Sequence, residues 1–573
     1  MKDRRFIYIL AFGIGVAPLL QSPYFQDNYT IIKWLGNYVL ASIVILVALF
    51  SGAQYRLPRF PKWIWGLILA LAAIFVGSHF LRTTPFFQYF TFDRVAFAAL
   101  LFISFNAFSF AMQNEITASK NVKTRPPALL ALAFACALSL YIFLPITIYQ
   151  FLGCRVWLQP ANIETSCFAA TTGNANMGAQ YVGIAAIFVF YGLSQTRHLW
   201  RAFFAFIGTL SLAFIVLSQC RSVILGMGAA LIVLLWAANY VPRKVLAFMV
   251  AGATAIVLLG NWAQGPAMAS RDKTFSTSER HSLLTSAIDL IGDNPLGAGS
   301  GGYEFGSVLY RMRTTHPPRT DTVFKSPHNE FLRFVAEDGV AFGIVMLVLI
   351  ASGFVALWKA WRNPSRKWAN ADFFFILTFG CVFGTEFLFQ FPVENAYPFL
   401  VWSAVLGFIL SRIFDSSELI REIRWPVASR AVAAVCLVVP TSVFTTSKFI
   451  EANYAENIEK THFACQIDSM NWRVCSDEAR DEVETRSYAR AIETMRGELH
   501  KRPYNFPILR MWGVLKVRIG DIPDSCRAFI FYDRMFVEKS DIHQYVTENC
   551  SAYPELHMDF REGYENYISK IVQ

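Results

Sequence analysis

The chain has 573 residues, of which 55% are apolar and only 16% are charged, whereas soluble globular proteins average about 25% charged residues. With a mean hydropathy of +0.39, this composition excludes an ordinary water-soluble protein. The 51 Lys and Arg against 41 Asp and Glu give a formal net charge of +10, and membrane topology accounts for much of this excess.

Apolar runs recur along the chain, and each run of about 18 to 22 residues can cross a hydrocarbon core about 30 Å thick. We therefore predict an all-α polytopic membrane protein with about 12 to 13 transmembrane helices. The predicted spans lie near residues 6–21, 35–52, 62–80, 95–113, 128–150, 177–194, 202–219, 222–240, 244–262, 339–358, 372–390, 397–414 and 427–447.

Positive charge is distributed unevenly between the connections. If the N-terminus is cytoplasmic, the inner connections hold 21 Lys and Arg residues and the short outer connections hold five. The positive-inside rule then predicts a cytoplasmic N-terminus. An odd number of spans places the segment after residue 447 on the outer side.

Two hydrophilic regions fall on that outer side, residues 263–338 and residues 448–573. We predict a transmembrane domain of residues 1–447, whose large outer loop carries the site, and a helical C-terminal domain of residues 448–573. The latter has the pattern of paired amphipathic helices, although no clear 34-residue repeat signature is visible.

The cysteines agree with this topology, because six lie in predicted outer segments and none lies in an inner loop. Disulfides persist in oxidising compartments. Cys154 and Cys167 are the expected bridge, with unpaired thiols as the alternative. Four others allow three pairings that the sequence leaves open: Cys465, Cys475, Cys526 and Cys550. No zinc-ligand spacing occurs, and we expect neither metal nor cofactor.

Two arginines stand out near the outer side. Arg221 lies in a tight turn between two apolar spans, where it is costly unless it is paired or reaches the interface. Arg280 is predicted to open an amphipathic helix over 279–291, and a cation in a first turn opposes the helix dipole, which indicates an anionic partner. The alternatives are an interfacial anchor for Arg221 and a solvated loop charge for Arg280.

His328 lies where the large loop returns to the membrane. A helix beginning near Pro327 would place His328, Leu332 and Val335 on one side. Histidine exchanges a proton near neutral pH, although a lone histidine is often structural. The glycine run at 297–302 follows a helix rather than a strand, and is therefore expected to end that helix in a turn rather than hold a nucleotide.

Amide and carboxylate side chains mark the outer ends of other spans. Asn174, Asn176 and Gln180 begin one span, where they can bind sugar hydroxyls or allow close helix packing. Three further polar residues, at the end of another span, are Glu386, Gln390 and Glu394.

Taken together in chain order, the segments that contain these polar residues resemble the superfamily of O-antigen ligases, O-antigen polymerases and protein O-oligosaccharyltransferases. The matching pieces are Gly173-Asn-Ala-Asn176, Ser218-Gln-Cys-Arg-Ser222, Arg280 followed by Asn294-Pro-Leu-Gly-Ala-Gly299, and Pro327-His-Asn-Glu-Phe-Leu-Arg-Phe-Val-Ala-Glu-Asp-Gly339. The resemblance implies a GT-C-like, metal-independent membrane glycosyltransferase in the bacterial inner membrane.

The same resemblance implies an undecaprenyl-diphosphate-linked glycan as donor and an acceptor on the periplasmic side. Arg221 and Arg280 would hold the diphosphate, and His328 would act at the acceptor hydroxyl. Attack opposite the diphosphate would invert the anomeric centre. Further residues expected to bind substrate are Asn174, Asn176, Gln180, Asn329, Glu337 and Glu394.

The acceptor remains open among lipid A-core, a protein Ser or Thr, and a growing glycan. We favour an O-antigen ligase over a protein O-oligosaccharyltransferase, with a polymerase third. The chain lacks the acidic residue before Tyr-Pro that the pilin-glycosylating branch has, and contains Gln390-Phe-Pro-Val-Glu394 instead. A lipid-glycan transporter is the competing class, but its charges would lie near the bilayer midplane.

Overall fold

The structure is a computed structural model. It describes residues 5–20, 55–58, 60–80, 100–102, 104–109, 128–153, 175–236, 243–264, 273–299, 302–311, 326–362, 370–390, 396–414, 420–423, 458–467, 472–535, 541–550 and 560–572, and isolated positions between 32 and 43, at 111 and between 426 and 450. The chain divides into two compact units. The first unit comprises Met1–Trp65, Phe92–Arg271 and Ile350–Ser442, and the second comprises Gly66–Thr91, Asp272–Leu349 and Val443–Gln573.

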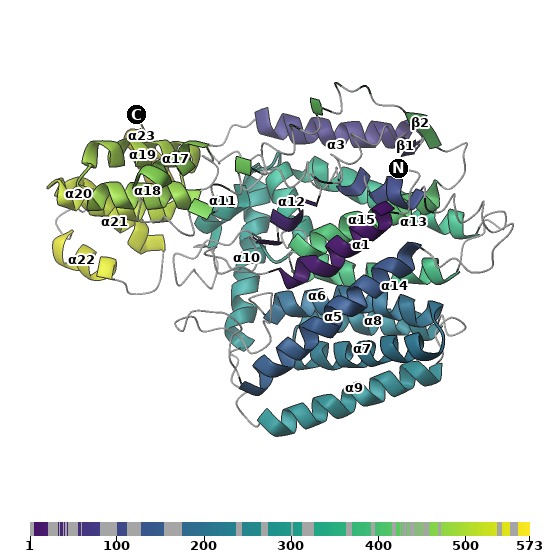
Figure 1. The fold of residues 1–573 in the computed structure, drawn as a ribbon. Helices are drawn as coiled ribbons and strands as arrows, with labels where there is room; N and C mark the ends of the chain where they lie inside the picture. Colours follow the sequence, from purple (N-terminus) through teal and green to yellow (C-terminus); the bar gives the residue numbers. More distant parts are fainter. Residues whose placement is uncertain are drawn as a thin grey trace. The chain divides into compact units, whose positions relative to one another are not determined.

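The first unit is built from apolar helices, in which α8 packs on α14, and α7 packs on both α6 and α9 (Figure 1). Because α6 is packed among α5, α7 and α14, nearly all of its side chains are buried. Its helices are α1 (Arg5–Val16), α5 (Ala128–Gly153), α6 (Ala175–Gln195), α7 (His198–Leu217), α8 (Arg221–Trp236), α9 (Arg243–Gln264), α14 (Asn370–Phe389) and α15 (Ala396–Ile413), with a short 3-10 helix at Ala17–Leu19. Two further helices run across the division between the units, α3 (Lys62–Phe80) and α13 (Val340–Arg362).

Five helices are long and apolar enough to cross a membrane: Ala128–Tyr149, Asn176–Gln195, His198–Leu217, Val340–Arg362 and Ala371–Phe389. Shorter apolar helices coincide with five more predicted spans, at Ile7–Leu19, Lys62–Leu71, Leu100–Ser109, Arg221–Leu235 and Tyr397–Ile413. The prediction of an all-α polytopic membrane protein is thereby confirmed. Val340–Arg362 is mostly exposed, as expected of an apolar helix that faces lipid.

A small antiparallel ribbon departs from the all-helical pattern. Strand β1 (Tyr55–Pro58) pairs with β2 (Ile420–Ile423), with Arg56 opposite Glu422 and Leu57 opposite Arg421. Both strands come from connections that the charge pattern assigns to the inner side. Their pairing requires these two connections to lie on the same side of the membrane.

At the opposite end of α6 from Gln180, a buried ion pair joins three helices. Asp372 of α14 pairs with Arg412 of α15 and accepts a hydrogen bond of 2.9 Å from the hydroxyl of Tyr191 in α6. Asp372 is buried. Because removing one partner would leave a charge without compensation, this contact fixes the relative positions of α6, α14 and α15.

The second unit contains both hydrophilic regions. From the large loop come α10 (Lys273–Asp293), α11 (Gly302–Arg311) and α12 (Glu330–Asp338). Tyr303 of α11 donates a hydrogen bond of 3.0 Å to the Leu283 carbonyl of α10. One hydrophobic cluster includes Leu290 and Ala336 from this loop, and Leu499 and Trp512 from the C-terminal segment.

The C-terminal segment folds into consecutive short helices (Figure 1). The helices α18 and α19 begin at Trp472 and Tyr488, and α20 and α21 begin at Phe506 and Ile522, in each case 34 residues later. The structure thus shows a 34-residue helix-pair repeat that the sequence conceals. The bounds are α17 (Ile458–Ile467), α18 (Trp472–Glu484), α19 (Tyr488–Lys501), α20 (Phe506–Arg518), α21 (Ile522–Met535), α22 (Asp541–Asn549) and α23 (Phe560–Val572).

Two disulfides join neighbouring helices of this segment. Cys465 of α17 is bonded to Cys475 of α18, and Cys526 of α21 is bonded to Cys550 just after α22. The structure thus selects one of the three pairings left open by the sequence. The expected bridge between residues 154 and 167 lies outside the described residues.

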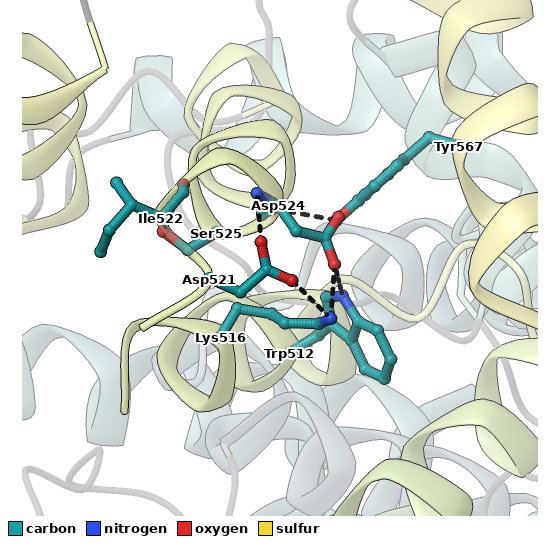
Figure 2. A network of polar contacts seen from close by, with 7 residues as sticks. All are labelled: Trp512, Lys516, Asp521, Ile522, Asp524, Ser525 and Tyr567. Atoms are coloured by element: carbon teal, nitrogen blue, oxygen red, sulfur yellow. Dashed lines mark hydrogen bonds and ion pairs between the residues drawn. The ribbon is translucent and has the colours of Figure 1, made fainter. Parts of the chain in front are cut away.

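A polar network joins the second helix pair to α23 (Figure 2). Asp524 accepts hydrogen bonds from Trp512 at 3.2 Å and Tyr567 at 2.8 Å, and it pairs with Lys516 at 3.0 Å. Lys516 also bonds to Asp521 at 2.9 Å, and this bond lowers the pKa of that carboxyl below its usual value. Burial raises the pKa of Tyr567 well above its usual range, so its hydroxyl remains a donor.

Candidate active site

Arg221 is the first residue of α8 and is exposed. A short turn at 218–220, with Gln219 at φ 55°, connects α7 to α8. The predicted tight turn between two apolar helices is present, and Arg221 directly follows it as the first residue of α8. Its charge therefore adds to the positive end of the α8 dipole. A guanidinium and the N–H groups of a first turn both favour an anion.

Two glycines allow α6, α8 and α14 to approach closely beneath this turn. A Cβ on Gly226 of α8 would lie 2.9 Å from the Cα of Val382 in α14. A Cβ on Gly183 of α6 would lie 2.6 Å from Cγ1 of Val223 in α8. Small residues permit such close contacts between membrane helices, and here they bring three helix ends together.

Side chains at these helix ends form hydrogen bonds between helices. Gln180 Nε2 of α6 donates to Glu386 Oε2 of α14 at 2.6 Å, and Gln390 Nε2 donates to Ser222 Oγ of α8 at 3.4 Å. All four side chains are buried. We call these four residues the amide cluster. It begins directly beside Arg221, because Ser222 is the next residue.

The residues predicted to bind sugar near these helix ends differ in their environment. Gln180 belongs to the amide cluster, and Asn176 is half-buried in the first turn of α6. Asn174 and Glu394 lie outside the described residues. Ser222 was not predicted, and its only signal in the sequence is its position next to Arg221.

Arg280 lies in the middle of α10 rather than in its first turn. The prediction that it opens a helix is wrong, because the polar stretch 273–279 is already helical. The dipole argument therefore does not apply to Arg280. Arg280 is half-buried and precedes the fully buried Leu283, Ala287 and Leu290 by about one, two and three turns. This spacing places it along the side of α10 that packs against α11 and α12.

His328 precedes α12 instead of lying on it. The predicted helix start near Pro327 is wrong because Asn329 is the N-cap, and its side-chain oxygen accepts a hydrogen bond of 2.9 Å from the Leu332 N–H. His328 therefore does not share a helix face with Leu332 and Val335. It is half-buried with φ 56°. Left-handed conformations of non-glycine residues are concentrated at functional sites.

Backbone hydrogen bonds hold the loop after α10 against the end of α12. Three bonds of 2.6–2.9 Å join residues 295–299 to residues 336–340. Gly297 has φ 95° and Gly339 has φ 94°, and each packs against the backbone of the other segment. We call this structure the α10–α12 knot. The glycine run thus ends a helix in a turn, as predicted.

The knot relates Arg280 to His328. Both α10 and α12 end at it and pack on each other, so Arg280 and His328 belong to one group of packed helices. Arg221 belongs to the first unit, whereas Arg280 and His328 belong to the second.

Carboxylates of α12 lie near the histidine in sequence. Glu330, two residues after His328, is buried and accepts a hydrogen bond of 2.7 Å from Arg333 Nε. Glu330 was not among the predicted site residues, although it follows the His-Asn pair directly. Glu337, predicted to bind substrate, is buried in the last turn of α12.

One group of possible metal ligands occurs among the described residues: Cys465, Cys475 and Glu498. The two cysteines are joined in a disulfide, and Glu498 pairs with the buried Arg502. These ligand atoms are therefore already engaged in other bonds.

The segment that holds these residues is similar to one known protein family. Residues 206–348 match the O-antigen ligase family. The match confirms the resemblance indicated by the sequence motifs. The O-antigen ligase segment runs from α7 into α13 and contains Arg221, Arg280 and His328. No curated protein matches the chain.

Proposed function

We propose that the protein transfers a glycan from undecaprenyl diphosphate to an acceptor hydroxyl on the periplasmic face, in the manner of an O-antigen ligase. The observation that carries this proposal is the O-antigen ligase match, because the matched segment contains both arginines and the histidine. The family is one of membrane glycosyltransferases, and the apolar helices supply the membrane part.

In this proposal the arginines bind the donor. Arg221 and the N-terminus of α8 provide a guanidinium and N–H groups for phosphoryl oxygens, and Arg280 provides a second guanidinium. These groups stabilise the charge that develops on the diphosphate as the bond between the anomeric carbon and the phosphate oxygen breaks.

His328 accepts the proton of the acceptor hydroxyl as that oxygen attacks the anomeric carbon. A general base of this kind contributes about 10²- to 10⁴-fold to the rate. Because the oxygen attacks opposite the leaving diphosphate, a single displacement inverts the anomeric configuration. These steps need no metal ion.

Polar residues around these groups bind the glycan. The amide cluster offers donors and acceptors at the helix ends beside Arg221, which supports a role in holding sugar hydroxyls. The same role is proposed for Asn174, Asn176, Asn329, Glu337 and Glu394.

The proposed topology has a cytoplasmic N-terminus, with the large loop and the C-terminal domain of residues 448–573 in the periplasm. The charge bias supports it, and so do the pairing of β1 with β2 and the hydrophobic cluster shared by the loop and the C-terminal helices. Alkaline phosphatase fused after residue 573 should be active, and an inactive fusion at normal expression would reverse the orientation.

The test of the proposed chemistry uses purified protein in proteoliposomes with an undecaprenyl-diphosphate-linked glycan and lipid A-core. His328→Ala and Arg280→Ala should abolish transfer, and Arg280→Lys should restore little of it, because an ammonium lacks the guanidinium fork. The control is His281→Ala, since His281 is exposed on the same helix. Near-normal transfer by either alanine variant would remove that residue from the proposed site.

The acceptor is tested in the same assay with lipid A-core, glycan or pilin-type protein. Label on lipid A-core supports the ligase, whereas label only on protein or on lengthened glycan would replace it with an oligosaccharyltransferase or a polymerase. Loss of donor from one leaflet without transfer would indicate a transporter.

A further inference from the structure

The C-terminal repeat is visible in its turns as well as in its helix lengths. Three backbone hydrogen bonds donated by residues 485–487 at the end of α18 recur, with the same acceptor spacing, at residues 519–521 after α20. Arg486 with φ 63° and Gly520 with φ 79° occupy the same place in the two turns. The two helix pairs are therefore structural copies, displaced by 34 residues.

The buried contacts of the two pairs also correspond. A Cβ on Gly513 of α20 would meet the ring of Phe529 in α21 at 2.7 Å, and the residues 34 positions earlier are Ala479 and Met495, both buried. In both copies a buried small residue in the first helix corresponds to a buried large one in the second, and all four belong to one hydrophobic cluster or pack within it. Thus α18 and α20 are equivalent first helices, and they pack side by side.

The outward faces of α18 and α20 are rich in arginine. Arg473 and Arg480 lie two turns apart on α18, and Arg510 and Arg518 lie about two turns apart on α20. All four are exposed. At 100° per residue, the repeat register places them within an arc of about 80°, away from most of the buried positions. Arg510 lies at the edge of this arc, 6.0 Å from the ring of Tyr532, and Arg518 donates a hydrogen bond of 3.5 Å to the Val483 carbonyl. We call this surface the arginine face.

Acidic residues on these helices neutralise only part of the positive charge of the arginine face. Arg480 pairs with Asp477 at 3.1 Å and with Asp481 at 3.6 Å, and Glu484 is exposed at the end of α18. Helix α20 contains no acidic residue. Its Lys516 is directed away, toward the network of Figure 2. The face therefore has an excess of positive charge, concentrated on α20.

The last helix covers a different side of the repeat. In α23, Tyr564 donates a hydrogen bond of 2.6 Å to the Pro503 carbonyl, and Tyr567 stacks on Phe531 of α21 at 5.5 Å. Helix α23 packs on α19. It therefore covers the second helices of the pairs and leaves the arginine face exposed.

We propose that the arginine face binds an extended acidic peptide segment. Stacked helical repeats present open surfaces of this kind to linear partners. Arginines seven or eight residues apart on a helix are separated by about 10 to 12 Å. In a polyproline-II chain, side chains three residues apart lie on one face and are separated by about 9 Å, which flexible arginine side chains can match. A peptide with a carboxylate at about every third position therefore matches the arginine spacing, and guanidinium groups bind carboxylates bidentately.

An anionic membrane surface fits this face less well. Proteins that bind membrane surfaces insert apolar and aromatic side chains beside their basic residues. Among the described side chains of α18 and α20, Val514 is the only large apolar one that is exposed. The face thus offers charge without the apolar contacts that lipid binding uses. The inference does not depend on the proposed glycan transfer.

The test uses the full chain in phosphatidylcholine nanodiscs and a fluorescent peptide of about twelve residues with Glu at every third position. Fluorescence anisotropy measures binding, and the same peptide with Gln in place of Glu is the comparison. Arg480→Glu combined with Arg510→Glu should weaken binding about tenfold or more, because attraction becomes repulsion at two sites. Added salt should weaken binding by the wild-type protein.

The matched control is Arg496→Glu combined with Arg527→Glu, which makes the same charge change at exposed positions of α19 and α21. This control should bind the acidic peptide like the wild type. The proposal is overturned by absent binding, by equal binding of the Gln peptide, or by equal losses in the two double variants.

A separate flotation assay uses phosphatidylglycerol vesicles. Vesicle binding that is lost in the Arg480/Arg510 variant, without peptide binding by the wild type, would assign the face to membranes and overturn the proposal. If the Arg480→Glu/Arg510→Glu variant unfolds at a lower temperature than the wild type, the variant Arg480→Gln with Arg510→Gln takes its place. Unchanged peptide affinity in the Gln variant would overturn the proposal.

Discussion

Replacing Gly297 with alanine should separate α10 from α12. Gly297 lies in the α10–α12 knot with φ 95°, where an L side chain is strained. A Cβ there would also lie 2.6 Å from the Gly339 nitrogen and 2.7 Å from the Asp338 carbonyl carbon. Both obstructing atoms belong to backbone, so no flexible side chain can move aside to relieve the clash.

The free-energy cost of the Gly297→Ala substitution follows from the strained backbone conformation and from the clash of the added Cβ. Left-handed backbone costs an L residue about 1–2 kcal/mol, and overpacking against rigid neighbours costs about 1–3 kcal/mol. Together they destabilise the knot by about 2–5 kcal/mol. In a unit of this size such a loss lowers the unfolding temperature by about 5–15 °C. Transfer should fall as well, because the knot sets the positions of α10 and α12, which carry Arg280 and follow His328.

Gly292 provides the matched control. It is an exposed helical glycine five residues earlier, and a Cβ there meets nothing within 4 Å. Alanine at this position should stabilise α10 by about 0.5–1 kcal/mol. The assay is the fraction of monodisperse protein left after heating in detergent, together with the transfer rate. Equal behaviour of the two alanine variants, or a Gly297→Ala protein as stable and active as the wild type, would refute this reasoning.

Three further perturbations test other contacts. Asp524→Ala should destabilise the second unit by about 1–3 kcal/mol, because the N–H of Trp512 loses its acceptor, whereas the hydroxyl of Tyr567 keeps the backbone carbonyl of Asp524 at 3.1 Å; the heating assay measures this. Burial raises the pKa of Glu482, so the folded state binds this proton more tightly than the unfolded state and stability falls as pH rises through that range. Glu482→Gln should therefore raise the unfolding temperature at pH 8 and change it little at pH 4, and an equal shift at both pH values would disprove the linkage. Glu386→Ala should cost about 1–3 kcal/mol by removing an acceptor inside the helix bundle, whereas Glu386→Gln should be milder; similar unfolding temperatures for the two would show that the bond contributes little.

Transmembrane helices were predictable because each apolar span satisfies its own backbone hydrogen bonds and therefore appears in the sequence as an uninterrupted run. Arg221 was predictable for the same reason, since a charge between two such runs can only lie in their connection. In contrast, the start of α10 was not predictable, because residues 273–279 show no apolar periodicity and are nonetheless helical.

The start of α12 shows competition between two capping signals. Ser326-Pro327 has the pattern of a helix start, with proline in the first turn. Asn329 offers another, and it is the one used, because its side chain reaches the Leu332 N–H. This difference of three residues moves His328 from a helix into a left-handed loop position, which periodicity alone cannot reveal.

The 34-residue repeat was hidden for a related reason. The equivalent positions conserve size and backbone conformation rather than residue type, as Ala479 and Gly513 show at the close contact, and Arg486 and Gly520 show in the turn. A search for identical residues fails under these conditions.

The O-antigen ligase segment crosses the boundary between the compact units, and this has a physical consequence for the proposed reaction. Arg221 is positioned by glycine contacts between apolar helices, whereas Arg280 and His328 are positioned by a hydrogen-bonded knot between the large loop and the start of α13. Helix contacts of the first kind depend on van der Waals packing in lipid, and the knot depends on backbone geometry that any Cβ disrupts. Changes of lipid or detergent should therefore act mainly through Arg221, whereas substitutions in the knot should affect Arg280 and His328 together, and with them both donor binding and proton transfer.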